Sequence, residues 1–125
     1  MSRRTYRDPR GTTSFTVPVY GGRVLLCKNR AVYNKALKQI GVDEDDELHA
    51  YKGISQRVTD VQQHSIYMVG WFDSRPSTLV HELAHTTFAV LSHAEVPISR
   101  ENEEAFAYLM DTLYADAIRA LKRKR

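Results

Sequence analysis

Two histidines and a glutamate form the pattern in this chain with the most specific chemistry. His81, Glu82 and His85 are spaced as H-E-x-x-H, inside a stretch that the apolar pattern predicts to be helical over 77–93. Residues four apart lie on one helical face, about 6 Å apart along the axis, so both imidazoles can reach one metal ion. Glu82 is rotated by about 100° from His81, which puts its carboxylate beside the ion rather than among its ligands. The pattern predicts a Zn²⁺ site with Glu82 as general base on zinc-activated water.

A catalytic zinc ion usually has three protein ligands, so a third ligand is expected. His93 lies eight residues beyond His85, roughly 12 Å along a straight helix, which is too far for the same ion. His49 and His64 lie upstream in expected strand or loop segments and are weaker candidates.

Carboxylates on the last predicted helix are the better candidates for the third ligand. A turn near Pro97 would return that helix beside the histidines, and the sequence ENEEAFAYLMD occupies residues 101–111. Helical projection puts Glu103 at the centre of the stripe that includes Phe106, whereas Glu104 lies about 100° to one side. The periodicity alone leaves the choice between the two glutamates open.

Two further side chains on this helix have candidate roles. Attack of a zinc-activated water on a carbonyl would need a donor for the tetrahedral oxyanion, and Tyr108 is a candidate; the alternative is core packing with a satisfied hydroxyl. Asp111 is a candidate acceptor for the second ring nitrogen of a ligand histidine, and the alternative is a plain exposed aspartate.

The elements that must position these residues indicate an α+β fold. Gly21 and Gly22 predict a two-residue hairpin turn, Asn29 and Gly41 bound a helix, and Ser99 is expected to cap the last helix. The expected elements in order are strands 15–20 and 23–27, a helix over 30–40, strands 48–58 and 65–72, a helix over 77–93, and a helix from residue 100 into the tail.

Length and charge distribution limit the organisation and the partners. The 125 residues fit one domain over 14–121, with a flexible basic arm at 1–13 and a basic tail at 122–125. The net charge is +3, but residues 11–118 carry nine basic and fourteen acidic residues, a net charge of −5. The basic residues are concentrated at the ends, and no basic patch interleaved with aromatic residues is present. We therefore do not expect nucleic acid as the partner. A protein that binds nucleic acid through its basic ends is a further alternative.

The single cysteine and the apolar runs indicate the compartment. Cys27 lies in an apolar run and is expected to be a small buried hydrophobic residue rather than a reactive thiol. No apolar run has the length of a signal peptide or of a membrane helix. A cytoplasmic protein without membrane contact is expected.

Two stretches carry a resemblance to a known family. TLVHELAH over 78–85, followed by ENEEAFAYL over 101–109, resembles small phage- and prophage-encoded HExxH zinc metallopeptidases of the gluzincin type. It is more distantly similar to the ImmA/IrrE-type peptidases. The resemblance spans about residues 65–115, and it implies Glu104 as third ligand, with Glu103 as the alternative, because the family's ligand precedes the small residue at Ala105.

The resemblance also implies a fold and an activity. The fold is a minimal zincin-like one, with a small mostly antiparallel sheet packed on the HExxH helix and a C-terminal helix. Strand 65–72 would then be the edge strand that pairs with an extended substrate. The implied activity is hydrolysis of peptide bonds, in the host cytoplasm if the protein is phage-encoded.

Two classes of function remain open. The first is a zinc metallopeptidase with ligands His81, His85 and Glu104, a shallow site, and a possible protein partner that completes the cleft. The second is a non-catalytic binding module in which the metal staples the two C-terminal helices and the protein acts on a host or viral protein. An intact Glu82 favours the enzyme, because a structural metal site does not need that residue.

Overall fold

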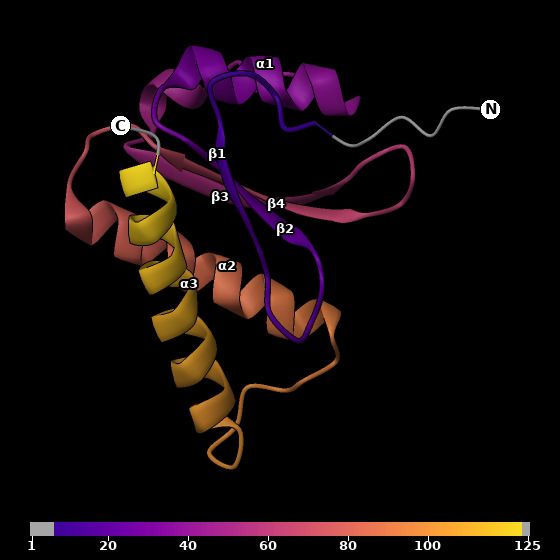
Figure 1. Ribbon diagram of the computed structural model, residues 1–125, viewed down its shortest axis with the longest axis vertical. Helices are drawn as coiled ribbons and strands as arrows, with labels where there is room; N and C mark the ends of the chain where they lie inside the picture. The colour runs from indigo at the N-terminus through magenta and orange to yellow at the C-terminus, as the bar shows by residue number, and fades with distance from the viewer. Residues whose placement is uncertain (1–6, 124–125) are drawn as a thin grey trace.

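The sheet has four strands in the order β1-β2-β4-β3, with one helix on one face and two on the other (Figure 1). The computed structural model describes residues 7–123. Its elements are β1 (Thr13–Thr16), β2 (Arg23–Cys27), α1 (Arg30–Ile40), the short 3₁₀ helix η1 (Leu48–Ala50), β3 (Gly53–Thr59), β4 (Ser65–Trp71), α2 (Pro76–His93) and α3 (Glu103–Arg123). The predicted α+β class is confirmed. Two strand pairings are antiparallel, and the central pairing of β2 with β4 is parallel.

Helix α1 covers one face of the sheet, and its ends lie where the sequence predicts them. The Asn29 side chain accepts a hydrogen bond from the Val32 N–H at 2.8 Å, and Gly41 ends the helix with a φ of 101°. Leu25 and Cys27 of β2 belong to the buried cluster that α1 covers. The prediction that Cys27 is a buried hydrophobic residue is confirmed.

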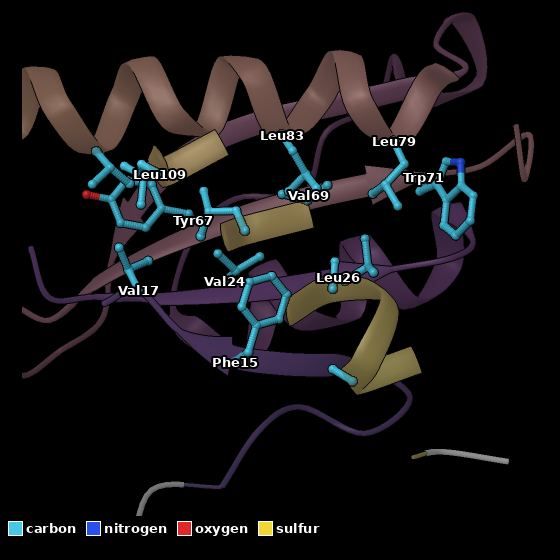
Figure 2. Close-up of a cluster of buried hydrophobic side chains, with 14 of the residues drawn as sticks. Phe15, Val17, Val24, Leu26, Tyr67, Val69, Trp71, Leu79, Leu83 and Leu109 are labelled. Atoms are coloured by element: carbon cyan, nitrogen blue, oxygen red, sulfur yellow. The ribbon is translucent and has the colours of Figure 1, made fainter. Parts of the chain in front are cut away.

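The opposite face of the sheet carries the larger core, beneath α2 and α3. Figure 2 shows Leu79 and Leu83 of α2 pointing toward Val69 and Trp71 of β4, and all four side chains are buried. Burying one such side chain contributes about 1.5–3 kcal/mol relative to leaving it in water. The apolar side of α2 therefore fixes the H-E-x-x-H helix to the sheet.

Strand β4 lies inside the sheet with both faces covered. Tyr67 and Val69 belong to the core under α2 and α3, whereas Ile66 and Met68 belong to the cluster under α1. The expectation that strand 65–72 is the edge strand is wrong, because β2 and β3 pair with β4 on its two sides. The edge strand that packs on α2 is β3.

The connection between β1 and β2 is longer than the predicted two-residue turn at Gly21 and Gly22. Strand β1 ends before Pro18, which has no N–H to donate to a ladder. A loop follows, and the Val17 N–H closes it by donating to the Gly22 carbonyl at 2.9 Å. The strand predicted over 15–20 is therefore wrong from residue 17 onward.

The described part of the expected N-terminal arm, residues 7–13, packs against the domain. Pro9 and Thr12 are buried, and the Asp8 carboxylate forms an ion pair with Arg23 of β2 at 3.0 Å. Residues 1–6 lie outside the described residues. At the other end, α3 continues to Arg123, and residues 124–125 of the expected tail also lie outside them.

Helix α3 begins at Glu103, three residues later than predicted. The Ser99 hydroxyl is buried without a hydrogen-bond partner, so it does not cap the helix. Asn102 stands at the start instead: its N–H donates to the Ser99 carbonyl, its side-chain amide donates to the Pro97 carbonyl, and its own carbonyl accepts from Phe106 N–H. None of the helices within residues 7–123 combines the length and the apolar character needed to cross a membrane.

Candidate metal site and catalytic base

His81 and His85 lie on the exposed side of α2 with their rings directed at each other. Their Nε2 atoms are 3.2 Å apart, and their ring centroids are 4.8 Å apart. Two imidazole nitrogens on one tetrahedral zinc ion, each at about 2.0–2.1 Å, would be roughly 3.3 Å apart. This distance is that of a hydrogen bond between the two rings, and it also matches the spacing of two nitrogens on a shared zinc ion.

Glu82 lies on the neighbouring side of α2 and is buried, with 7% of its surface exposed. Its burial raises the pKa of the carboxyl above the usual value, and the charges of His81 and His85 oppose that rise. A carboxylate with a raised pKa is a stronger proton acceptor. The raised pKa is the property that a general base needs, and the side chain lies where α2 meets Gly53 of β3.

An open hollow of about 560 Å³ lies beside Glu82 and His81. Its wall is formed by the start of α2 and by the chain that leads into β3, namely Ala50, Tyr51, Lys52, Gly53, Ser77, Thr78, His81 and Glu82. Tyr51 and Lys52 line this hollow, and the Tyr51 hydroxyl lies 3.5 Å from the Glu47 carboxylate. The sequence gives no signal for either residue, because their position depends on how β3 packs against α2.

The start of α2 is fixed by hydrogen bonds just before the motif. The Arg75 N–H and the Thr78 hydroxyl donate to the Asp73 carboxylate at 3.0 and 2.7 Å, and they hold its pKa below the usual value. The Trp71 indole N–H donates to the Arg75 carbonyl at 2.7 Å. Pro76 occupies the first turn, where its missing N–H is not needed. These contacts set where the helix begins and hence where His81 points.

The two candidate third ligands lie at the exposed start of α3. Glu103 and Glu104 are its first two residues. Helix α3 crosses α2 (Figure 1), and Phe106 packs on Phe88 with ring centroids 4.7 Å apart. Within residues 7–123, no three His, Cys, Asp or Glu side chains form a group that could hold a metal ion. The structure brings together His81, Glu82 and His85, and it does not bring either glutamate to them.

The two other candidates on α3 also lie apart from the histidines. Tyr108 is 70% exposed and lines a separate hollow of about 350 Å³ with Val19 and Tyr20 of the β1–β2 loop. Asp111 is exposed, and in the described part of the chain it makes no hydrogen bond to His81 or His85.

The other three histidines lie in other surroundings, and His49 is exposed in η1. His93 contacts Arg57 and Ser65, and His64 lies 3.5 Å from the Asp60 carboxylate. His64 and His93 line a separate hollow of about 420 Å³. No metal-binding group in residues 7–123 includes them.

Comparisons with protein-family models, curated proteins and solved structures find no match for this chain. Two imidazole nitrogens converge at 3.2 Å, and a buried carboxylate stands next to them on the same helix. Two imidazoles at this spacing supply two of the ligands that a divalent metal ion needs, and the carboxylate beside them is a proton acceptor.

Proposed function

We propose that this protein is a zinc-dependent metallopeptidase that hydrolyses peptide bonds in a peptide or protein substrate. The observation that carries the proposal is the 3.2 Å spacing of the His81 and His85 Nε2 atoms beside the buried carboxylate of Glu82. Burying a carboxylate costs free energy, so this combination is not expected on an amphipathic surface helix that has no function at this position.

The proposed zinc ligands are His81, His85 and Glu104, with Glu103 as the alternative. Imidazole nitrogen and carboxylate oxygen are both ligands that zinc prefers. Contact between Phe88 and Phe106 keeps the first turn of α3 near the turn of α2 that follows His85, and a glutamate of this turn would have to swing toward the histidines to bind zinc.

The zinc ion and the residues around it would have separate roles in the proposed hydrolysis. A zinc ion held there would activate a water molecule as the nucleophile for peptide hydrolysis. Glu82 would accept a proton from that water and return it to the leaving amine. Lys52 lines the hollow with Glu82, so we propose that Lys52, rather than Tyr108 in its separate hollow, donates to the developing oxyanion.

A zincin-like interpretation of the fold is supported by one arrangement: the antiparallel edge strand β3 packs beside the H-E-x-x-H helix. The substrate would then pair with β3 rather than with β4.

The hollow is open, so we expect short extended substrates or a protein partner that completes the cleft. We place the reaction in the cytoplasm, which for a phage-encoded protein is the host cytoplasm.

Metal analysis and one conservative variant test this proposal. Protein purified without chelators should contain about one equivalent of zinc, which His81→Ala should lose. Glu82→Gln should keep the zinc and the circular dichroism spectrum but lose cleavage of a mixed peptide library, read by mass spectrometry. The matched control is Glu101→Gln, an exposed glutamate near the start of α3 that should leave both properties unchanged.

Two results would overturn the proposal. Absence of any bound metal would remove its basis. Retained zinc with no cleavage by the unsubstituted protein, and a cellular effect that Glu82→Gln leaves unchanged, would support the non-catalytic module in which the metal staples α2 to α3.

A further inference from the structure

The outer edge of β3 presents a row of unpaired backbone groups. The Phe72 N–H donates to the Lys52 carbonyl at 2.9 Å, and the Asp60 N–H donates to the His64 carbonyl at 3.1 Å. Hydrogen-bonded and non-hydrogen-bonded pairs alternate along an antiparallel ladder, so the even-numbered residues of β3 bond to β4. The N–H and C=O groups of the odd-numbered residues then point away from the sheet. No strand within residues 7–123 pairs with that side.

The side chains of the same odd-numbered residues face α2. Gly53 lies against Glu82, where a Cβ would be 3.0 Å from the glutamate Cγ, and the Ser55 hydroxyl is 3.0 Å from the Thr86 hydroxyl. The Arg57 guanidinium lies 3.3 Å from the His93 ring. Strand and helix therefore run side by side away from the proposed catalytic base. Four residues of strand put Arg57 about 13 Å from Gly53.

Arg57 brings a positive charge to the far end of this edge. Its Nε–H donates to the Ser65 hydroxyl at 3.1 Å, and its Nη2 contacts the His93 Nε2, so the guanidinium has a defined position while remaining exposed. In the described part of the chain no ion pair uses Arg57. Asp60, the acid of the following turn, accepts from the N–H groups of Gln62 and His64 and lies beside the His64 ring.

We infer that the protein selects extended peptides with an acidic side chain about four residues from the peptide bond that lies next to Glu82. Arg57 is the residue that binds this acidic side chain. The inference rests on the proposed function and adds the chemical class of its substrate. Backbone pairing along an edge strand supplies affinity without sequence preference. A fixed guanidinium supplies the preference, because it binds a carboxylate with two parallel hydrogen bonds.

Binding of two labelled peptides to the full chain carrying Glu82→Gln tests this inference without cleavage of the probe. The peptides are identical except that two neighbouring glutamates in one are glutamines in the other. Fluorescence anisotropy should show about three- to tenfold tighter binding of the acidic probe. Adding Arg57→Glu should abolish or reverse that preference, and Arg57→Lys should retain part of it because the charge remains.

Lys35→Glu is the matched control, because it makes the same change of charge at an exposed position of α1, on the opposite face of the sheet. It should keep the acidic preference. Equal binding of the two probes, or the same behaviour of Arg57→Glu and Lys35→Glu, would overturn the inference. Displacement of the acidic probe by single-stranded DNA, added at the same concentration of negative charge, would also overturn the inference, because the surface would then bind nucleic acid.

Cleavage by the unsubstituted protein separates this inference from the proposed function. Cleavage of both peptides at equal rates would support the peptidase activity and contradict the preference for acidic peptides. An Arg57-dependent preference with no cleavage of either peptide would keep the peptide-binding edge and remove the catalytic role of Glu82. Circular dichroism and thermal melting of each variant show whether it is folded.

Discussion

Gly53 sets how closely β3 approaches the proposed catalytic base. A Cβ at this position would lie 2.8 Å from Thr78 Cγ2, 2.9 Å from the Gly70 carbonyl oxygen and 3.0 Å from Glu82 Cγ. Each of these distances is shorter than ordinary van der Waals contact. The absence of a side chain at Gly53 is therefore what lets the strand lie directly on the side of α2 that carries Glu82.

Gly53→Ala should lower the free energy of unfolding by about 1–3 kcal/mol, because the added methyl group must displace its neighbours. It should also lower kcat/KM for cleavage by about 10- to 100-fold, since Glu82 is one of the displaced groups. Zinc content should stay unchanged, because neither histidine is touched. Urea denaturation, steady-state kinetics and metal analysis measure the three effects.

Gly41→Ala is the control for this substitution. No atom outside the neighbouring backbone lies within 4 Å of a Cβ at Gly41, so alanine is strained there only by the left-handed φ. The free energy of unfolding should fall by about 1 kcal/mol. Cleavage should not change. Full activity of Gly53→Ala would mean that contact with the strand does not position Glu82.

Among the elements, those with local signals are the ones that the sequence predicts well. The side chain of Asn29 and the backbone freedom of Gly41 act within a few residues, so the ends of α1 are predicted, and Pro76 marks the start of α2. His81, Glu82 and His85 are predicted together because they share one helix. The start of α3 is not predicted, because the burial of Ser99 removes it as a cap.

The position of the first turn of α3 depends on the crossing of two helices, which no periodicity specifies. Phe106→Ala removes the ring that packs on Phe88 and should lower the free energy of unfolding by about 2–3 kcal/mol. If the first turn supplies the third zinc ligand, zinc affinity should fall several-fold as well. Urea denaturation and zinc titration measure the two effects.

Tyr108→Ala is the control on the same helix, because its side chain is largely exposed and its loss should cost less than about 1 kcal/mol. Zinc affinity should be the same as in the unsubstituted protein. Loss of stability in Phe106→Ala with unchanged zinc affinity would exclude the first turn of α3 as the source of a ligand.

On the scale of the whole molecule, the order of the strands is the feature that the sequence does not predict. The apolar composition of residues 65–71 identifies a strand, but it does not show that β2 pairs with it in parallel or that β3 takes the edge. Burial of both faces of β4 follows from that order, because α1 covers one face and α2 with α3 covers the other. Cys27 at the end of β2 is buried for the same reason.

Burial raises the pKa of the Cys27 thiol to about 12, and this has a consequence for stability against pH. The unfolded thiol ionises near pH 8.5, whereas the folded thiol stays protonated. Its contribution to stability is therefore complete below about pH 8.5 and is lost as the pH rises toward 12. Urea midpoints should fall between pH 8.5 and 10, and Cys27→Ala should show a smaller fall over the same range.

The native thiol should also be unreactive toward Ellman's reagent at pH 8 and should react fully in denaturant. Rapid modification of the folded protein would contradict the burial of Cys27. An equal loss of stability in Cys27→Ala would assign the alkaline sensitivity to another group, such as Tyr33, whose burial also raises its pKa.

The position of β4 between β2 and β3 also sets the order in which the chain can assemble. Thr59 of β3 pairs with Ser65 of β4 only six residues later, whereas Arg23 of β2 pairs with Ile66, 43 residues further along the chain. A hairpin of the first kind closes in about 1–10 μs, while the second contact must first overcome the entropy of a long loop. We therefore expect β2 to dock on the free edge of β4 more slowly than the β3–β4 hairpin closes, which stopped-flow refolding would measure. Until this docking occurs, the core beneath α2 and α3 lacks Val24 and Leu26 of β2.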